Sequence, residues 1–542
     1  MATCPTVLKT LVALMLSAVA TAIKREQKCE HSKFQADLNV HPHDFDAKHF
    51  NRVSNLDRLM QSGTETTHKM VIIADFNAIP DGYNKTWIKA VYEGYSLKRI
   101  MEIMSVTNTP QMPVLRTTTC SGISLPANYT NGSLTADLII MVKTFEKNTS
   151  TLATGGWCAL SSKNRPVIGV MNINTWFLKP TGEDDIEYMG NIYIHETFHA
   201  MGFSGSLFKY FPNQINSTVN LTTSAGTFTN IPMIVSPGVV AWGKSHFACD
   251  TLTGIPFENE GGSGTAGAHW EKTIMGNEGM TGVASGKMVF TQATFNFFQD
   301  SGLYTADMSL ADVATWGKGQ GCSFMNHRCS TSFTKEFGVS NARMCSRDYT
   351  IKTIASRGTV TDTCQQFNFF STYRCNQGLK FNTNVANETY GANSRCFQVN
   401  RPRWTPSGTF GCFKSYCVNN TVIFTSSSTN YTCTQSGQNI TTGDNVIQCP
   451  DLTDFCGQLN QKCPDDCNGN GRCQIGGTCR CFFFYEGDRC QTKKTCDFGP
   501  DICKIQGVAG GSMNEFDNAE TASTPIIRAL ILLIVFVLLG SN

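Results

Sequence analysis

The chain has 542 residues, with 44 Lys and Arg against 42 Asp and Glu, so its formal net charge is +2 at pH 7. That length is too great for one ordinary hydrophobic core and predicts several domains, while the near balance of charge gives no reason to expect a nucleic-acid partner. Only 16% of the residues are charged and 47 are glycine, a composition that indicates strands, turns and long loops in an extracellular setting.

The chain begins with a predicted secretory signal peptide, residues 1–22. Lys9 precedes the apolar run LVALMLSAVA, and the small residues ATA end at Ala22. A positive charge, a short apolar run and small residues before the cleavage site are typical of a signal peptide. A membrane-spanning helix needs about 20 apolar residues, more than this run has. We therefore expect cleavage after Ala22 and export through the secretory pathway.

Sequons of the form Asn-x-Ser/Thr agree with export, because this pattern is the acceptor for N-glycosylation in secreted proteins. Their number makes glycosylation of some of them an expectation. The asparagines concerned are Asn84, Asn128, Asn131, Asn148, Asn216, Asn220, Asn387, Asn419, Asn430 and Asn439.

Cysteine usage divides the chain in two. Of the 24 cysteines, Cys4 lies in the signal peptide and Cys29 stands alone in a predicted pro-segment, residues 23–65, so 22 remain. An even number in an oxidising compartment fits a full set of disulfides. Only three cysteines lie between residues 70 and 320, and 19 lie between 322 and 503. We expect a hydrophobic core to hold the first half and disulfides to hold the second.

The predicted subdomain of residues 66–204 alternates apolar segments with a helical pattern. The segments HKMVIIADF, ADLIIMVKTF and RPVIGVMNIN predict buried strands. DDIEYMGNIYI then places Ile186, Met189 and Ile192 at helical spacing, and one internal glycine is tolerable in a helix. The residues therefore predict buried strands followed by a helix.

That helix contains HETFH, residues 195–199, which matches H-E-x-x-H. Four residues turn an α-helix by about 400°, so His195 and His199 project from one face. Their ring nitrogens can bind one Zn²⁺ at about 2.0–2.1 Å, and Glu196 can reach a metal-bound water without binding the metal. Gly202 can adopt positive φ, which lets the chain turn back with a third ligand. The competing interpretation is a helix that carries these residues by chance.

Two histidines compete for the place of third ligand in the predicted subdomain of residues 205–320. They are His246 in WGKSHFACD and His269 in GTAGAHWEK. Between His199 and His269 lie 69 residues, including two sequons and the glycine-rich stretch GGSGTAG. This insert must loop out and return to the metal, and spacing alone does not choose between the two histidines.

Several stretches resemble the leishmanolysin family of cell-surface zinc metallopeptidases. They are HETFHAMGFS, SHFACDTLTGIPFENEGG, GAHWEK and NEGM, with RPVIGVMNIN upstream and DSGLYTADMSLADVATWGKGQGCSF downstream. The resemblance covers about residues 68–460, with the motifs in the family's order. It implies an α+β fold: a zincin catalytic domain of metzincin type that carries the H-E-x-x-H helix. A disulfide-rich, mostly β or irregular domain, residues 321–458, is expected to follow.

The same resemblance assigns the remaining metal-site residues. It implies that His269, in the Gly-x-His-Trp segment, is the third zinc ligand, and that His246 has a packed or hydrogen-bonded role. It also implies that Met280, eleven residues after His269, lies in a tight turn below the metal. From the sequence alone, an ordinary core methionine is a rival interpretation of Met280. The chain departs from the family here, because it has Gly279 where the family usually has leucine.

The expected activity is zinc-dependent hydrolysis of peptide bonds in protein or peptide substrates, with one Zn²⁺ per chain. Three neutral imidazoles leave one zinc position open, and water there has its pKa lowered toward about 7. We expect Glu196 to take the proton from this water as general base and to deliver it to the leaving amine.

Cys29 has a possible inhibitory role in a zymogen, because a thiolate is a good zinc ligand. A pro-segment cysteine could fill the open metal position until the segment is removed. The family has such a cysteine followed two residues later by histidine, and Cys29 and His31 match it. The flanking residues depart, with Gln27 and Ser32 where the family often has histidine and aspartate. The alternative is a cysteine in a disordered leader.

Residues 459–492 resemble an EGF-like module, since CPDDCNGNGRCQIGGTCRCFFFYEGDRC has six closely spaced cysteines. So small a unit has too little core to fold without disulfides. The resemblance implies the pairs Cys463–Cys473, Cys467–Cys479 and Cys481–Cys490. Phe482, Phe483 and Phe484 are either a contact surface or pack on the neighbouring domain, and the partner of the module is left open.

The chain is predicted to end in a linker, residues 493–525, and a hydrophobic tail, residues 526–542. Only three residues follow the apolar run, without a basic flank, and small residues and a polar spacer precede it. This pattern fits a GPI-attachment signal, with Gly511, Ser512 or Asn514 as the attachment residue. The competing interpretation is a short single-pass helix. We expect the protein at the extracellular face of the plasma membrane, with a secreted form as the alternative.

Two function classes follow. The first is a GPI-anchored zinc endopeptidase, with a possible role in cell adhesion. The second is an adhesion or surface-coat protein with an EGF-like module and an inactive peptidase fold. The presence of His195, Glu196, His199, His269 and Met280 together favours the enzyme.

Overall fold

The computed structural model describes residues 66–508, apart from short internal stretches. These are residues 109–110, 212, 214, 224–225, 263–264, 327–328, 331, 359, 363, 378–384, 386, 401–408, 444 and 460–462. The predicted signal peptide, the pro-segment with Cys29 and the hydrophobic tail lie outside the described residues. In the part of the chain that is described, no helix is long and apolar enough to cross a membrane.

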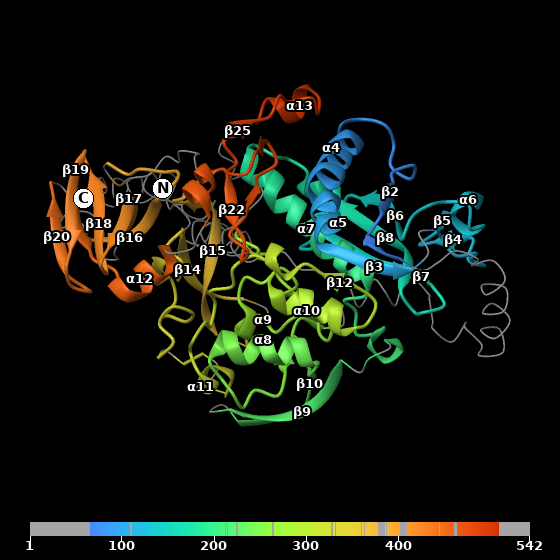
Figure 1. The fold of residues 1–542 in the computed structure, drawn as a ribbon, viewed down its shortest axis with the longest axis horizontal. Coiled ribbons are helices and arrows are strands. Elements are labelled where there is room, and N and C mark those ends of the chain that lie inside the picture. The colour runs from blue at the N-terminus through green and yellow to red at the C-terminus, as the bar shows by residue number, and fades with distance from the viewer. Residues whose placement is uncertain are drawn as a thin grey trace, which may run out of the picture.

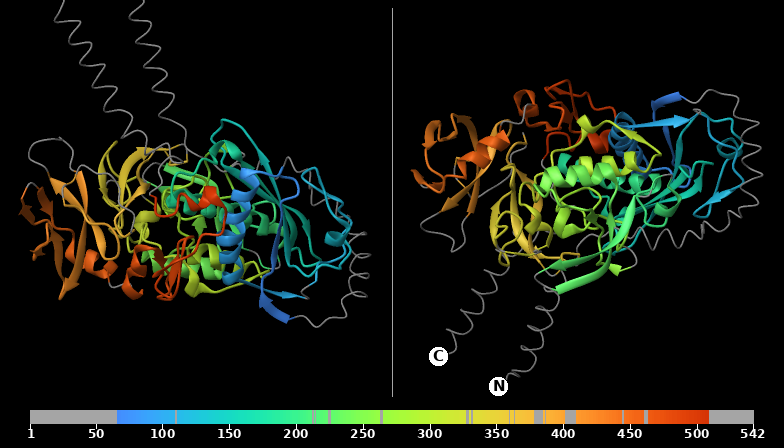
Figure 2. Two further views of the ribbon diagram at one scale, coloured as in Figure 1. Left: turned by 90° about the horizontal axis from the view of Figure 1, so that it is seen from above. Right: turned by 60° about the horizontal axis from the view of Figure 1, so that its bottom comes forward.

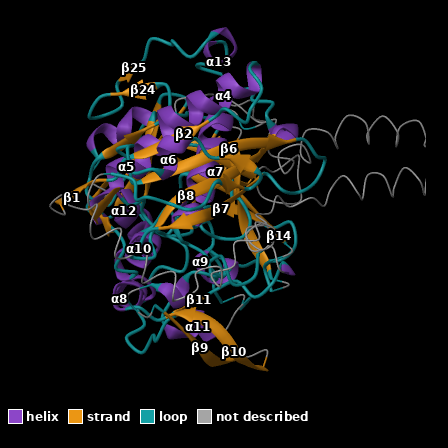
Figure 3. Ribbon diagram, turned by 90° about the vertical axis from the view of Figure 1, so that its right-hand side faces the viewer, coloured by secondary structure: helices purple, strands orange, loops and turns teal. Residues whose placement is uncertain are grey.

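A four-stranded sheet lies at the centre of the first half, in the order β2-β6-β8-β7. Its strands are β2 (Ile72–Asp75), β6 (Leu138–Phe145), β8 (Pro166–Asn174) and β7 (Ala153–Leu160). The first three run parallel, and β7 is the antiparallel edge strand. Helix α7 (Glu183–Met201) packs on the sheet, so closely that a Cβ at Gly155 would lie 2.1 Å from the carbonyl oxygen of Glu196. Figure 3 shows α7 and these strands together.

The segment HKMVIIADF differs from its prediction as one buried strand. It forms β1 (Thr66–Lys69), which joins a separate sheet of order β1-β3-β12, and β2, which joins the main sheet. The break falls at Met70 and Val71, where the Val71 N–H donates to Asp137 Oδ2 over 2.8 Å. The single-strand prediction is wrong because an apolar run carries no signal of which sheet each part joins.

A second helical rod lies against α7. It consists of α4 (Tyr83–Val91), the π-helical segment η2 (Tyr92–Leu97) and α5 (Lys98–Ile103), without interruption. Ser96 Oγ donates to the Gly190 carbonyl oxygen over 2.7 Å. A Cβ at Gly190 would lie 2.4 Å from Tyr95 Cδ1. Gly190 therefore allows the two helices to approach closely.

The middle of the chain, residues 205–320, is built of loops, short helices and a β-hairpin. The hairpin strands β9 (Asn216–Thr223) and β10 (Gly226–Ile234) form an antiparallel sheet with β11 (Ile255–Pro256) and extend from the body of the molecule (Figures 1 and 3). Its main helices are α8 (Pro237–Phe247), α9 (Lys272–Met275) and α10 (Gln292–Asp300).

Short elements complete these two parts. They are β3 (Met104–Asn108), β4 (Thr119–Cys120), β5 (Ile123–Ser124), α6 (Ala127–Thr130), η3 (Thr175–Phe177), η4 (Phe208–Tyr210), β12 (Thr305–Ala306) and η6 (Met308–Leu310).

The following region is rich in strands and disulfides, so the chain is α+β with a disulfide-rich C-terminal region, as the sequence predicts. A three-stranded sheet and a six-stranded sheet of order β19-β18-β17-β16-β21-β20 dominate it. The six-stranded sheet lies at one end of the molecule and the α7 half toward the other (Figures 1 and 2). The elements are α11 (Cys322–Asn326), β13 (Arg343–Cys345), β14 (Ile351–Arg357), β15 (Gln365–Arg374), β16 (Ser394–Asn400), β17 (Thr409–Val418), β18 (Thr421–Ser426), β19 (Thr429–Cys433), β20 (Asn439–Thr442), β21 (Asn445–Gln448) and α12 (Leu452–Leu459).

Disulfides join every cysteine among the described residues, which accounts for the even number of cysteines. Eight of the pairs lie outside the EGF-like cysteines, and two of these lie in or tether the first half: Cys120–Cys158 and Cys249–Cys322. The others are Cys329–Cys364, Cys345–Cys396, Cys375–Cys412, Cys417–Cys456, Cys433–Cys449 and Cys496–Cys503.

The last described part packs on the α7 half of the molecule. Its elements are η7 (Pro464–Gly469), β22 (Gly471–Cys473), β23 (Cys479–Cys481), β24 (Tyr485–Glu486), β25 (Thr492–Lys493) and α13 (Pro500–Cys503). Residues 493–508, which the sequence assigns to a linker, are folded. Ile502 and Ile505 join the main core, and the Glu183 N–H at the start of α7 donates to the Val508 carbonyl oxygen over 2.9 Å.

Candidate metal centre

Helix α7 is fixed at both ends. Asp185 Oδ2 accepts hydrogen bonds from the N–H groups of Thr181 and Gly182, at 2.7 and 3.2 Å, and so caps the first turn. An acidic first turn also suits the positive end of the helix dipole. Gly202 ends the helix at a φ of 119°, in the left-handed region that favours glycine. The helix therefore stops directly after the H-E-x-x-H segment, as predicted for Gly202.

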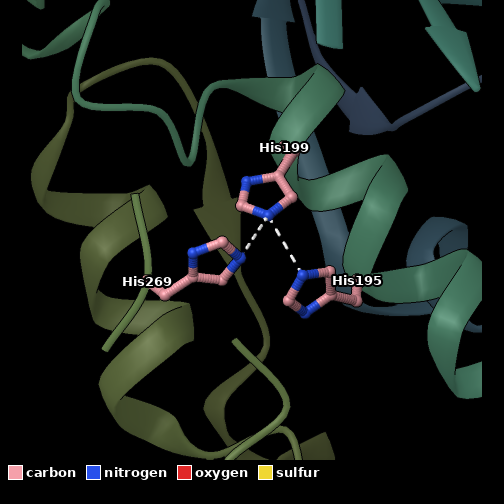
Figure 4. A group of neighbouring side chains, drawn as sticks. All are labelled: His195, His199 and His269. Carbon is pink, nitrogen blue, oxygen red and sulfur yellow. Dashed lines mark hydrogen bonds between the residues drawn. The ribbon is translucent and has the colours of Figure 1, made fainter. Parts of the chain in front are cut away.

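The structure brings three imidazoles to one point, two from α7 and one from the loop before α9 (Figure 4). His199 Nε2 lies 3.0 Å from His195 Nε2 and 3.1 Å from His269 Nε2. The three ligand atoms lie within 4.8 Å of one another, and all three side chains are buried. Nitrogens bound to one tetrahedral Zn²⁺ at about 2.0–2.1 Å would lie about 3.3 Å apart, which is close to what is seen.

Each imidazole is oriented by a hydrogen bond on its other nitrogen. The Nδ1 atoms of His195, His199 and His269 lie 2.6, 2.6 and 2.9 Å from the carbonyl oxygens of Gly279, Phe203 and Thr265. A carbonyl oxygen only accepts, so each Nδ1 carries the proton and each Nε2 offers a lone pair. Three lone pairs that face one another repel unless a cation lies between them. The residues therefore fit a zinc ion.

Burial keeps the His195 imidazole neutral. It lowers the pKa of His195 to about 4, although the hydrogen bond to the Gly279 carbonyl acts in the opposite direction. A neutral imidazole is the form that binds a metal.

The loop that carries His269 is tied to the segment around Met280. The Trp270 N–H donates to the Met280 carbonyl oxygen over 2.9 Å, and the Met280 N–H donates to Glu278 Oε2 over 2.5 Å. Glu278 Oε1 accepts from Thr294 Oγ1 over 2.6 Å, and Trp270 Nε1 donates to the same hydroxyl over 2.9 Å. Met280 itself is fully buried. This network holds the Gly279 carbonyl against His195.

Steric packing explains why this chain has glycine at position 279. A Cβ at this position would lie 2.3 Å from the ring of Phe290. Phe290 therefore fills the space that a larger residue at position 279 would need.

Two other predicted residues have clear positions. Glu196 follows His195 in α7, and its side chain is fully buried. His246 lies in α8 and not at the triad. Its ring stacks on Trp242 with centroids 4.5 Å apart, and its Nε2 lies 2.7 Å from the Trp316 carbonyl oxygen. His246 is thus packed and hydrogen-bonded.

Comparison with known proteins matches the same part of the chain. Residues 97–357 match the family model described as leishmanolysin. The chain contains a leishmanolysin-family domain. It is 31% identical to a leishmanolysin homolog of Crithidia fasciculata over 41% of this chain and 33% of that protein. It is 34% identical to a leishmanolysin-like peptidase of Drosophila pseudoobscura pseudoobscura over 31% of this chain and 29% of that protein.

A third relative, leishmanolysin of Leishmania major, is 30% identical over 39% of this chain and 34% of that protein. The chain thus spans about a third of the length of the leishmanolysin relatives it matches. Outside the leishmanolysin domain, residues 463–493 match a Teneurin-like EGF domain.

The EGF-like module has the three disulfides that its resemblance implies, Cys463–Cys473, Cys467–Cys479 and Cys481–Cys490. Phe482, Phe483 and Phe484 are buried, and Phe483 and Phe484 belong to the main core. The structure therefore supports the second alternative, in which these aromatic side chains pack on the neighbouring domain.

Sequence reasoning missed the groups that orient the three histidines. The three carbonyl oxygens leave no signal in the sequence, because every residue carries one. Glu278 lies in the NEGM segment, but its role cannot be predicted from the sequence because its burial next to Thr294 is a tertiary feature.

Proposed function

We propose that the protein is a zinc-dependent endopeptidase that acts on protein or peptide substrates. The observation that carries the proposal is the convergence of three Nε2 lone pairs, each fixed by an Nδ1–carbonyl hydrogen bond. The leishmanolysin-family match supports the same reaction class. A zinc ion held by His195, His199 and His269 supplies Lewis-acid chemistry, which polarises a carbonyl group and acidifies water.

Glu196 is the proposed general base. It follows His195 in α7 and is buried, as His195 is. In this role it would take a proton from the attacking water and deliver it to the leaving amine. Met280 has a supporting role, since the turn that contains it aims the Gly279 carbonyl at His195.

We also propose that the protein is exported and held at the cell surface by a lipid anchor. Disulfide pairing of all described cysteines supports an oxidising compartment. Exposed sequon asparagines such as Asn84, Asn128 and Asn387 support glycosylation. Cys29 remains a proposed latch on the metal site. Release of the protein from intact cells by a phosphatidylinositol-specific phospholipase tests the anchor, and persistence on the membrane would favour the single-pass alternative.

The central experiment compares wild-type ectodomain with Glu196→Gln. Wild type should contain one zinc per chain and digest a protein substrate, and a chelator should stop digestion. Glu196→Gln should keep its zinc and lose at least about a hundredfold in turnover, since general acid–base groups contribute about 10²–10⁴-fold. Glu93→Gln, at an exposed glutamate, is the matched control. Wild type that binds zinc but digests nothing, with or without removal of the pro-segment, would favour the inactive, adhesive alternative.

A further inference from the structure

One side chain of the EGF-like module contacts two segments that support the metal centre. Arg472, in β22, places Nη2 2.7 Å from Glu187 Oε1 of α7, and its Nη1 donates to the Met288 carbonyl oxygen. Glu187 lies about two helical turns before His195 on the same helix. The Glu187 side chain is 2% exposed and the Arg472 side chain 10%, so solvent barely screens this pair.

Met288 lies in a segment that is hydrogen-bonded to Gly279, the residue whose carbonyl orients His195. Residues 286–290 form a segment that we call the backing segment. In it, the Gly279 N–H donates to the Val289 carbonyl oxygen over 2.7 Å, and the Val289 N–H donates to the Asn277 carbonyl oxygen over 3.0 Å. The carbonyl oxygen of the same residue, Gly279, accepts the hydrogen bond from His195 Nδ1. The backing segment therefore sets the position of the carbonyl that aims the His195 ring.

A second arginine makes the same kind of bridge from another domain. Arg374, in β15, donates from Nη1 to Glu187 Oε2 and from Nη2 to the Gly286 carbonyl oxygen, the latter over 2.6 Å. Glu187 thus lies between two guanidinium groups, and each of them also binds the backing segment. Planar guanidinium groups suit this task because they hold several N–H donors in a fixed geometry.

The module is held firmly enough to act in this way. The Ile475 N–H donates to the Ala311 carbonyl oxygen over 3.0 Å, and the Gly476 N–H donates to the Ser309 carbonyl oxygen over 2.8 Å. Arg480 lies 3.4 Å from Asp312, whose carboxylate also binds Arg99 Nη2 at 2.9 Å. With the buried Phe483 and Phe484, these contacts dock the module on the leishmanolysin domain.

We propose that the EGF-like module is a built-in brace for the metal centre and that Arg472 is a positioning residue for His195. Arg472 joins the helix that carries His195 to the backing segment that aims its ring. The partner of this face of the module is therefore the leishmanolysin domain of the same chain. This inference rests on the proposed zinc site.

The test uses the whole ectodomain, with the metal alone for binding and a protein substrate for kcat and KM. Zinc affinity is measured by competition with a chromophoric chelator, and ligand geometry by the visible spectrum of the cobalt-substituted protein. Arg472→Ala removes both contacts. Arg472→Lys keeps the charge but cannot span both acceptors, and it covers the case in which the alanine variant does not fold. Arg489→Ala is the control, because Arg489 is in the same module and pairs with Asp465 at the surface.

Arg472→Lys should raise the zinc dissociation constant about tenfold, as loss of groups that orient metal ligands typically does, and should alter the cobalt spectrum. It should lower kcat more than it changes KM. Arg489→Ala should match wild type in all three measurements. Arg472 variants with wild-type zinc affinity and cobalt spectrum would overturn the brace. Wild type that binds neither metal would instead refute the proposed zinc site.

Discussion

A backbone carbonyl oxygen at Nδ1 orients the imidazole of each of the three clustered histidines. The carbonyls of Gly279, Phe203 and Thr265 come from three separate loops, and each fixes the tautomer that turns Nε2 toward the centre. His195 and His199 could be predicted from sequence because helical geometry alone places residues four apart on one face. His269 could not be chosen over His246 by spacing, because tertiary contacts such as the Trp270–Met280 hydrogen bond bring its loop to His195 and His199.

Because sequence spacing does not distinguish His246 from His269 as the third ligand, variants of these two residues form a matched pair. His269→Asn should weaken zinc binding by more than the roughly 10–100-fold that loss of an outer hydrogen bond costs, because a ligand itself is removed. His246→Gln should retain wild-type zinc affinity, since its contacts are the Trp242 ring and the Trp316 carbonyl. Chelator competition on both purified variants measures the difference. Equal zinc loss in the two would contradict the assignment of His269.

At the scale of elements, α7 is a helix whose whole circumference is buried. All its residues from Glu183 to Met201 are buried. The sheet and the α4–η2–α5 rod cover parts of the helix, and β15 and the EGF-like module cover the part around Glu187. Its existence could be predicted from the spacing of Ile186, Met189 and Ile192. Its neighbours could not, because the η2 rod and the split between β1 and β2 depend on pairing with distant segments.

A substitution at Gly190 tests how tightly this helix is packed. In an exposed helix, glycine to alanine stabilises by about 1 kcal/mol. Gly190→Ala should instead destabilise by about 1–3 kcal/mol, because the new Cβ would lie 2.4 Å from Tyr95 Cδ1. Gly457→Ala, in α12, is the control, since nothing lies within 4 Å of its Cβ position. Urea unfolding of the two variants should give shifts of opposite sign. A stabilising Gly190→Ala would mean that the two helices are more loosely packed.

At the scale of the molecule, buried ion pairs connect parts that are far apart in sequence. Arg374 and Arg472 meet Glu187 from the disulfide-rich domain and the EGF-like module, and Lys287 meets Asp348. In the sequence these charges cannot be told from the solvated charges of any surface. The local cysteine spacing therefore predicts the EGF-like module, and the resemblance implies its disulfide pairs. Neither indicates the face on which the module docks.

These ion pairs make the stability of the whole molecule depend on pH. Burial alone would raise the pKa of Glu187, but Arg374, Arg472 and Arg480 outweigh it and lower the pKa to about 2, from a usual value of 4.5. The folded state thus favours the ionised form. Its stabilising contribution is fully present above pH 4.5 and is lost as the pH falls through about 2. Asp184, a neighbour of the same cluster, has its pKa raised to about 7 by burial and contributes in the opposite direction.

Glu187→Gln isolates this contribution in zinc-free protein. At pH 7 it should destabilise by about 3–5 kcal/mol, because it leaves buried guanidinium groups without their carboxylate. Toward pH 2 its stability should approach that of wild type, in which Glu187 is then protonated. Urea unfolding at pH 7, 5 and 3 gives the comparison. Asp465→Asn, which breaks the exposed pair with Arg489, should cost at most about 1 kcal/mol at each pH. A Glu187→Gln deficit that stays constant over this range would mean that the carboxylate is not held ionised by the arginines.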